Sequence, residues 1–312
     1  AITGTGFQPD LTWVKSRNIN YDHQLHDSVR GAGYGIMSND TTAQFFYDTI
    51  TSFDSNGFTV DANSYIGTNA SGQDFVAWSW KAGGAAVSNT DGTITSQVSA
   101  NVDAGFSIVK YVGNSSANGT VGTGLSSAAE IIIVKNIDNG SALWSVYSSS
   151  VGANQTAHLN TTAAYSSSGD WNSTTATASV FSIGSSASGR TNSSGQNHIA
   201  YAFHSVDGYS KMGSYVGNGS ATGPIITLGF EPAWVMIKSS SSAEPWVIFD
   251  SVRNTSNPRT CHLRANNNIA ESCLASESVD FNATNFQIKS SWAALNTNGG
   301  TYIYMAFAAD PT

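Results

Sequence analysis

The residues of this chain that could bind a metal ion are few and scattered. Six histidines are present, at positions 23, 26, 158, 198, 204 and 262. His23 and His26 are too close in sequence to be two ligands on one strand face, and no cysteine or glutamate accompanies them at zinc spacing. Asp54 and Asn56 offer oxygen ligands, but the bidentate acid of a helix–loop–helix calcium site does not follow them. The sequence therefore predicts no metal and no cofactor, with a loop-bound calcium ion as the open alternative.

Residues for hydrolysis are equally sparse. A glycoside hydrolase needs two carboxylates about 5 to 9 Å apart with differently tuned pKa values. No acid pair recurs in the three similar segments described below, which leaves a single active segment as the alternative. A Gly-x-Ser-x-Gly nucleophile elbow is absent, and Cys261 and Cys273 lack a neighbouring base pattern. We therefore expect a protein that is not an enzyme.

The two cysteines are expected to form a disulfide. Cys261 and Cys273 stand twelve residues apart, in a segment that predicts a hairpin around Ala265-Asn-Asn-Asn268. Strands paired about that loop bring the two thiols opposite each other, and an extracellular setting permits their oxidation.

Aromatic residues give a binding hypothesis its basis. The chain has 8 Trp, 12 Tyr and 14 Phe. Four tryptophans lie on strand segments that recur, and these are expected in the core: Trp13, Trp78, Trp80 and Trp234. Exposed rings near polar loops could stack on a sugar while neighbouring amides bond its hydroxyls. Three tryptophans are candidates for this role: Trp171, Trp246 and Trp292.

One stretch recurs three times along the chain. Phe-Gln-Pro-Asp-Leu-Thr-Trp-Val-Lys at 7–15 returns as Phe-Glu-Pro-Ala-Trp-Val-Met-Ile-Lys at 230–238, and in degenerate form at 125–135. Each copy is a turn, a short apolar run and a lysine, which predicts a strand with a buried face. Aromatic strands end 65, 68 and 69 residues beyond the lysines, at Trp80, Phe203 and Phe307. An Asn-x-x-Gly turn precedes each of these strands, so we expect three copies of one β unit.

The charged residues that recur are expected to be structural. A lysine ends the strand in every copy, so its stem should lie along the sheet with the ammonium in water or beside an acid. The three lysines are Lys15, Lys135 and Lys238. Asp27 with Arg30, and Asp250 with Arg253, are expected to be local ion pairs or turn-locking hydrogen bonds. The middle copy has Ser-Ser-Ser-Val at 148–151 instead. The loss of the Asp–Arg pair from one copy is consistent with a structural role for the pair.

These landmarks predict an all-β chain of three units. Strand signals return every 8 to 12 residues, and no window holds an apolar face at helical spacing for three turns. We expect tandem β-sandwich, jelly-roll-like modules at 1–84, 105–207 and 208–312, with a connecting segment at 85–104. Gly-aromatic-Ser strands at 105–114 and 208–218 lead the second and third units, and the first unit lacks one. Either the chain continues upstream of Ala1 or a neighbouring element supplies that strand.

Composition limits the partners. The net charge is -8, the pI is near 5.0 and only 11% of residues are charged. Nucleic-acid binding needs a basic face, so it is not expected. No apolar run approaches the roughly 20 residues of a membrane span, and no signal peptide is visible. Abundant Ser, Thr, Asn and Gly are typical of β-rich surfaces and favour an extracellular or particle surface.

Four motifs together resemble a domain of unknown function that is common in marine tailed phages. They are the stretch at 7–15, Asp-Ser-Val-Arg-Gly at 27–31, Thr-Ser-Phe-Asp-Ser-Asn-Gly-Phe-Thr-Val at 51–60 and Phe-Val-Ala-Trp-Ser-Trp-Lys-Ala-Gly-Gly at 75–84. The resemblance covers most of the chain. It implies a component of the virion surface, of the kind labelled tail fibre or structural protein, and favours a homotrimer. It brings no catalytic residues with it.

Two functions therefore compete. The first is a host-recognition adhesin of a tail fibre or spike, whose loops bind a cell-surface glycan or protein. The second is a structural virion protein, a capsid decoration, knob or fibre module that binds only other virion proteins. Repeated weak contacts suit both, because multivalency turns them into firm attachment. The unpaired strand edge of the first unit adds a reason to expect a neighbour.

Overall fold

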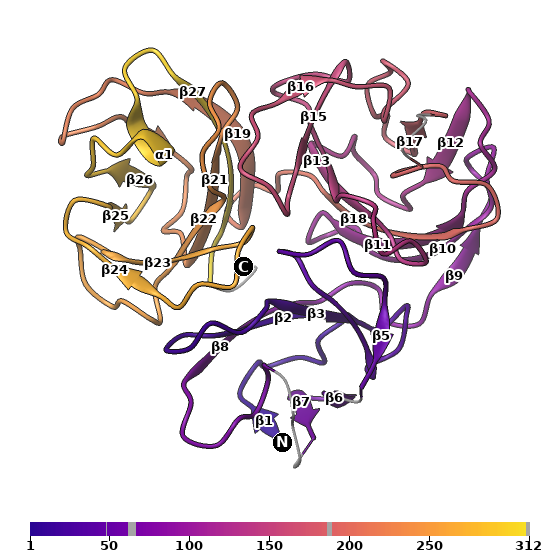
Figure 1. Cartoon of the computed structure of the whole chain (residues 1–312), viewed down its shortest axis with the longest axis horizontal. Coiled ribbons are helices and arrows are strands. Elements are labelled where there is room, and N and C mark those ends of the chain that lie inside the picture. Colours follow the sequence, from indigo (N-terminus) through magenta and orange to yellow (C-terminus); the bar gives the residue numbers. More distant parts are fainter. Residues whose placement is uncertain (48, 62–66, 186–188, 310–312) are drawn as a thin grey trace.

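Three large antiparallel sheets make up most of the molecule (Figure 1). The computed structural model describes residues 1–47, 49–61, 67–185 and 189–309. The first sheet has the order β5 (Phe45–Phe46), β4 (Tyr34–Ile36), β3 (Gln24–Asp27), β2 (Leu11–Ser16), β8 (Phe75–Trp80). The second has the order β16 (Ser166–Ser167), β15 (Gln155–His158), β14 (Ser145–Ser148), β13 (Ile131–Asn136), β18 (Asn197–Phe203), β11 (Phe106–Val112), β10 (Ser96–Asn101), β9 (Val87–Asn89). The third has the order β19 (Ser210–Val216), β27 (Thr301–Phe307), β21 (Trp234–Ser239), β22 (Val247–Asp250), β23 (Cys261–Arg264), β24 (Ser272–Cys273).

A small sheet covers the outer face of each large one. The small sheets are β1 (Ile2–Thr3), β7 (Gly57–Val60), β6 (Ile50–Asp54); β12 (Gly119–Gly122), β17 (Val180–Ile183); and β20 (Ile225–Thr227), β26 (Asn285–Ile288), β25 (Val279–Asn282). Among the described residues the single helix is α1 (Ala293–Asn296), which is far too short to cross a bilayer. The chain is therefore all-β, as predicted.

The strand pairs β2 with β8, β13 with β18 and β21 with β27 share one register. Each repeated lysine lies opposite an apolar residue of the strand that ends in the repeated aromatic residue. The pairs are Lys15 with Val76, Lys135 with Ile199 and Lys238 with Ile303. Four residues before each lysine, the pairs are Leu11 with Trp80, Ile131 with Phe203 and Trp234 with Phe307. The landmarks seen in the sequence therefore occupy matching places in the three sheets.

In each large sheet one strand is buried on both faces along its whole length: β2, β13 and β21. Successive side chains of a strand point to opposite faces. On β13, Ile131 and Ile133 lie in a central core, whereas Ile132 and Val134 pack with residues of β12 and β17. This double burial accounts for the uninterrupted apolar run at 131–134, where a half-exposed strand would alternate.

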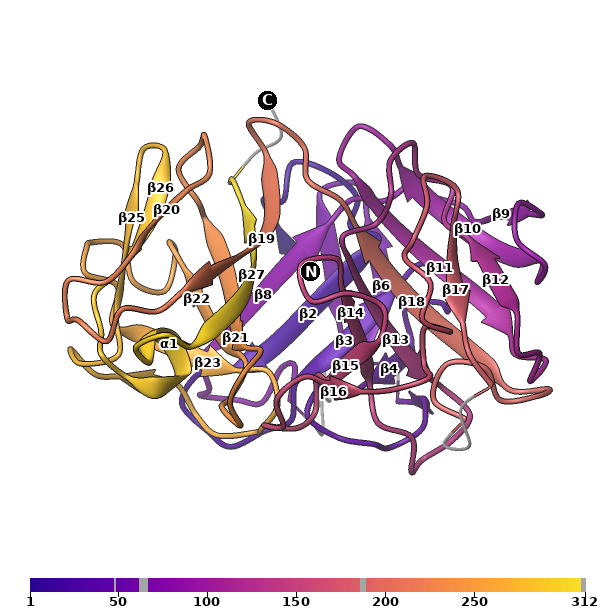
Figure 2. The same cartoon turned by 90° about the horizontal axis from the view of Figure 1, so that it is seen from above.

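The three large sheets meet around the central core (Figure 1). The turned view of Figure 2 shows the second and third sheets to either side, with β2 and β8 of the first between them. Phe307 lies where the sheets meet, because its ring centroid is 5.8 Å from that of Trp80 and 5.8 Å from that of Phe203. One core therefore joins residues that are more than 200 positions apart in the chain.

These contacts add two features to the organisation expected from the sequence. The segment 85–104 is more than a connection, because it contains β9 and β10, and β10 pairs with β11 along its whole length. The units are also not separate sandwiches, because all three large sheets contribute side chains to the central core. The physical reason is that a small sheet covers only one apolar face of each large sheet, and the other face needs its neighbours.

Candidate functional site at the open edge of the first sheet

The repeated lysines are fully buried and hold backbone loops. Lys135 Nζ donates to the carbonyl oxygens of Thr41, Asn136, Asn139 and Ala142, at 2.8 to 3.2 Å. The lysines at 15 and 238 likewise donate to backbone carbonyl oxygens, at 2.6 to 3.4 Å. Burial lowers the pKa of all three ammonium groups to about 8. The expectation that these groups reach water or an acid is therefore wrong, since carbonyl oxygens replace the water.

Three rings link neighbouring sheets through backbone carbonyl oxygens. Trp144 donates to Met37, Trp246 to His158 and His23 to Arg264, at 2.9, 3.0 and 3.1 Å. Nδ1 of His23 accepts a hydrogen bond from Trp13 Nε1 at 2.9 Å, which leaves the proton on Nε2. Burial lowers the pKa of His23 to about 3. These hydrogen bonds join the second sheet to the first, the third sheet to the second and the first sheet to the third. Together they connect all three sheets in a closed circuit around the central core.

The tryptophans expected in exposed positions do not form a ligand platform. Trp171 and Trp246 are 1% and 2% exposed, so that expectation is wrong for both. Trp292 is half-buried, with its ring centroid 5.2 Å from the guanidinium carbon of Arg264 and 5.2 Å from the ring of His262. Trp171 belongs to the apolar cluster of the second unit and Trp246 to the central core, and a sequence window does not reveal this packing. The four tryptophans expected in the core lie there: Trp13, Trp78, Trp80 and Trp234.

The Asp27–Arg30 pair is a buried anchor between two sheets. Asp27 accepts hydrogen bonds from the backbone N–H of Arg30 at 2.8 Å and from its Nε at 2.5 Å, as predicted for a local pair. Both side chains are fully buried. Asp27 also accepts a hydrogen bond from the hydroxyl of Tyr201 in the second sheet, at 2.8 Å. The pair therefore fixes a turn and joins sheets as well.

The other two units show why this pair is present or lost. Asp250 binds Arg253 in the same way and accepts a hydrogen bond from Trp78 Nε1 at 3.1 Å. In the second sheet, Ser148 pairs with Ile131 as Asp27 pairs with Leu11. The third-sheet residue that matches Tyr201 and Trp78 in register is Met305. Methionine has no hydrogen to donate, so a carboxylate at position 148 would lack this donor from the neighbouring sheet. A buried carboxylate without donors is costly, which accounts for the serine at this position.

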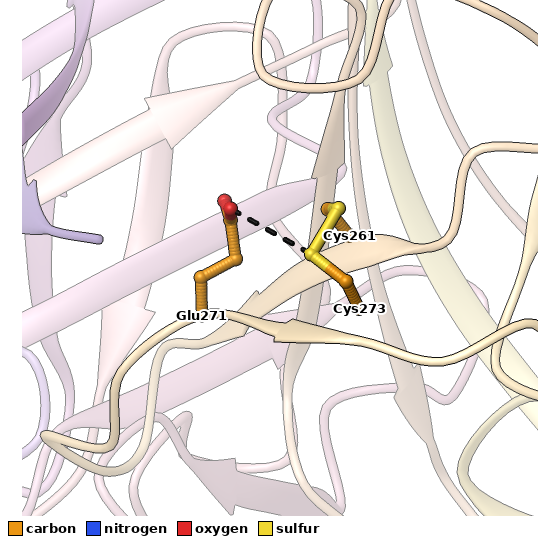
Figure 3. A group of neighbouring side chains, drawn as sticks. All are labelled: Cys261, Glu271 and Cys273. Atoms are coloured by element: carbon orange, nitrogen blue, oxygen red, sulfur yellow. Dashed lines mark hydrogen bonds between the residues drawn. A yellow bond between two sulfur atoms is a disulfide. The ribbon is translucent and has the colours of Figure 1, made fainter. Parts of the chain in front are cut away.

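The cysteines form the expected disulfide beside a charged cluster (Figure 3). Cys261 of β23 lies opposite Cys273 of β24. Glu271 accepts hydrogen bonds from Arg17 of the first unit and from Arg253 of the third, and one of its oxygens lies 3.7 Å from Cys273 Sγ. Cys261, Glu271 and Cys273 are close enough to hold an ion. With the sulfurs bonded and the carboxylate paired to two guanidinium groups, the cluster instead ties the third unit to the first.

A cleft of about 610 Å³ runs along β8, between the first and third units. One wall is the strand from Phe75 to Lys81, and the other includes Ser251, Val252 and Ala308. Val252 is 80% exposed. The cleft is thus bounded by an exposed sheet edge on one side and an exposed apolar side chain on the other.

The cleft exists because β8 is an edge strand. It pairs with β2 on one side, and none of the described residues forms a strand on the other. Trp80 O accepts from Asp10 N and Asp74 O accepts from Arg17 N, so even-numbered residues of β8 face β2. Backbone groups alternate along an antiparallel strand, so those of residues 75, 77 and 79 point into the cleft. The matching strands β18 and β27 are covered on this side by β11 and β19.

Side chains are also less buried on β8 than on the covered strands β18 and β27. On β18 and β27 every residue after the first is buried. On β8 only Trp78 and Trp80 are buried, and Ala77 is exposed. The sequence signal for this site was the missing Gly-aromatic-Ser strand ahead of the first unit. Sequence reasoning assigned no role to a second exposed feature, the rings of Tyr34, Phe46 and Tyr47, which are 37%, 56% and 62% exposed.

The chain belongs to a family described as a domain of unknown function, DUF7483, whose model matches residues 1–311. No curated protein and no solved structure matches the chain significantly. The family description assigns no activity, so a function has to be argued from the geometry of the chain itself.

Proposed function

We propose that this DUF7483 protein is a non-enzymatic component of a bacteriophage particle that holds another particle protein at the edge of β8. The cleft beside β8 is the observation that supports this proposal most strongly. An uncovered strand edge with an exposed Ala77, and an exposed Val252 in the same cleft, offer backbone hydrogen bonds and apolar contact, which suit a polypeptide. The phage particle, and a place on its outer surface, rest on the motifs at 7–15, 27–31, 51–60 and 75–84.

A second candidate function, adhesion to a host glycan, is supported by a different group of residues. Tyr34 and Phe46 lie edge to face on neighbouring strands at the end of the first sheet, with ring centroids 4.9 Å apart. Tyr47 is more exposed still, at 62%. Exposed aromatic rings can stack on a sugar face. These three rings replace Trp171 and Trp246 as the residues on which an adhesin would depend.

We also propose that the three units are copies of one ancestral β unit. The shared register, the three buried lysines and the ring-to-carbonyl links support this view. The three large sheets already complete a core within one chain. Trimerisation is therefore not needed to close that core, and a homotrimer would form through outer surfaces.

Site-specific photo-crosslinking in particles that contain this chain tests the proposed function. A photoreactive amino acid at Ala77 should crosslink to a different polypeptide of the particle. The same amino acid at Val87, which is 64% exposed on the edge strand of the second sheet, is the matched control and should give far less product. Equal yields at both positions, or no product at position 77, would overturn the proposal.

Two further measurements separate the alternatives. Incubation of the purified chain with host envelope polysaccharide should release no reducing ends, and their release would overturn the non-enzymatic assignment. Replacing Phe46 and Tyr47 by Ser should leave the crosslink at position 77 unchanged. A large loss of particle adsorption to host cells in this double variant, with the crosslink absent, would favour the adhesin instead.

A further inference from the structure

The strands that cover β18 and β27 show what kind of segment fits beside β8. β11 pairs with β18 over Phe106–Val112, and β19 pairs with β27 over Ser210–Val216, both antiparallel. Both covering strands run into the same four residues, Tyr-Val-Gly-Asn, at 111–114 and 215–218. The contacts of these four residues therefore describe the chemistry that the open edge of the first sheet would recognise.

The tyrosine of this segment stacks on a ring of the covered strand. Tyr111 lies on His198 with centroids 5.0 Å apart and planes at 9°, and Tyr215 lies on Tyr302 at 4.9 Å and 10°. Both tyrosine hydroxyls donate to a backbone carbonyl oxygen, at 2.7 and 2.8 Å. In the first sheet the matching position is Phe75, which lies opposite Ser16 as Tyr302 lies opposite Ser239. Phe75 is only half-buried, and it packs against the cluster of Val14, Ile50 and Phe58.

The glycine of the segment is required by close backbone approach. A Cβ on Gly113 would lie 2.3 Å from the carbonyl oxygen of Ser193, and one on Gly217 would lie 2.3 Å from that of Thr297. The two glycines also exchange backbone hydrogen bonds of 2.8 to 2.9 Å with the turn before the covered strand, at 195–196 and 299–300. The first unit has Gly72 and Gln73 at this place. A side chain at the glycine position is therefore not tolerated.

We propose that the edge of β8 binds an extended Tyr-x-Gly-Asn segment of a different polypeptide, antiparallel to β8, with the tyrosine on Phe75 and the glycine beside Gly72 and Gln73. This inference rests on the proposed function and specifies the partner's sequence. Within residues 1–312 both Tyr-x-Gly-Asn segments are already paired, so a second folded copy of these residues has no such segment to donate, and we assign the segment to a different polypeptide.

The backbone of β8 sets the register of the added strand. By the pairing of β19 with β27, the tyrosine lies opposite Phe75, and the residue two positions before it lies opposite Ala77. Because residues 75, 77 and 79 direct their N–H and C=O groups into the cleft, the added strand forms a regular antiparallel ladder. This mode of binding combines main-chain hydrogen bonds for affinity with one ring and one glycine for specificity.

A labelled peptide of residues 208–218, Gly-Tyr-Ser-Lys-Met-Gly-Ser-Tyr-Val-Gly-Asn, is the probe that tests this inference. Its fluorescence anisotropy should rise saturably when the full chain is added. Peptides that carry Tyr215→Ala or Gly217→Val should bind about tenfold more weakly or worse, because they lose the stacked ring or collide with the backbone. Amide hydrogen exchange should slow at residues 75, 77 and 79 when the unaltered peptide binds.

Variants of the chain locate the binding site. Ala77→Pro removes an N–H group that points into the cleft and should abolish binding, whereas Val87→Ala on the other exposed edge should leave it unchanged. Phe75→Ala, a milder change, should weaken binding about tenfold even if Ala77→Pro impairs folding. Equal binding of a scrambled peptide, or undiminished binding by the Phe75→Ala chain, would overturn the inference. A crosslink at position 77 without peptide binding would also overturn this inference but leave the proposed function standing. Peptide binding without a crosslink at position 77 would overturn the proposed function alone.

Discussion

Tyr201 on β18 and Asp27 on β3 belong to different large sheets, and a hydrogen bond of 2.8 Å joins the hydroxyl of one to the carboxylate of the other. Both residues are buried, so the bond lies where water cannot replace it. A second link of this kind joins Trp78 of the first sheet, as donor, to Asp250 of the third. The Asp–Arg pairs thereby connect a local turn to the packing of the whole chain.

Replacing Tyr201 by Phe should lower the free energy of unfolding by about 1 to 3 kcal/mol, because the buried carboxylate of Asp27 loses a donor. Urea denaturation of Tyr201→Phe against the unaltered chain measures the effect. Tyr47→Phe, at a side chain 62% exposed, is the control and should change little. Identical denaturation midpoints for all three proteins would contradict the anchoring role.

Lys135→Met should destabilise the fold by roughly 3 kcal/mol, because four carbonyl oxygens lose the ammonium that they share. Lys81→Met, at an exposed lysine, should stay within about 0.5 kcal/mol of the unaltered chain. Denaturation midpoints compare the two variants. If Lys135→Met were as stable as Lys81→Met, the carbonyl cage would contribute nothing.

The protein should lose stability between pH 7 and pH 5. Burial lowers the pKa of four histidines to about 3 or 4: His23, His26, His198 and His262. The unfolded chain, with histidine pKa values near 6.5, therefore binds more protons than the folded chain, and stability falls as pH drops from about 6.5 toward 4. Urea midpoints at pH 7, 6 and 5 test this, and His198→Gln should show a smaller fall. A flat profile over this interval would show that these histidines titrate normally.

Loss of the disulfide should cost about 3 kcal/mol, the value expected for a closed loop of this length. Cys261→Ser with Cys273→Ser, measured against the oxidised chain, gives the difference. Mass spectrometry after alkylation checks the bond itself: the thiols should react only after reduction. Alkylation of both cysteines in the unreduced protein would show that no disulfide is present.

A single unit should not fold alone. The isolated segment 208–312 would expose Trp234, Met236 and Phe307, which face the central core in the whole chain. We expect weak near-ultraviolet circular dichroism and no cooperative thermal transition for this segment, in contrast to the full chain. A sharp transition would mean that the third unit has a sufficient core of its own.

The sequence by itself determined the recurring strands and the hairpin that joins the cysteines. Turn residues, short apolar runs and constant spacing are local signals, so Lys15, Lys135 and Lys238 could be placed at matching positions before any contact was known. The same signals placed Trp13 and Trp234 in the core and indicated that the first unit lacks a leading strand. These features depend on residues that are near one another in the chain.

Only the tertiary structure decided which of these residues are covered and by what. Lys135 is buried because Thr41, 94 residues away, supplies a carbonyl oxygen, and Trp246 is buried because its N–H meets the carbonyl of His158, 88 residues away. The central core arises in the same way, since each large sheet keeps a second apolar face that its own small sheet does not reach. Burial of a side chain depends on all the surfaces that pack over it, and those surfaces come from segments whose proximity no local pattern records. The edge of β8 is the opposite case, because no strand among the described residues covers it.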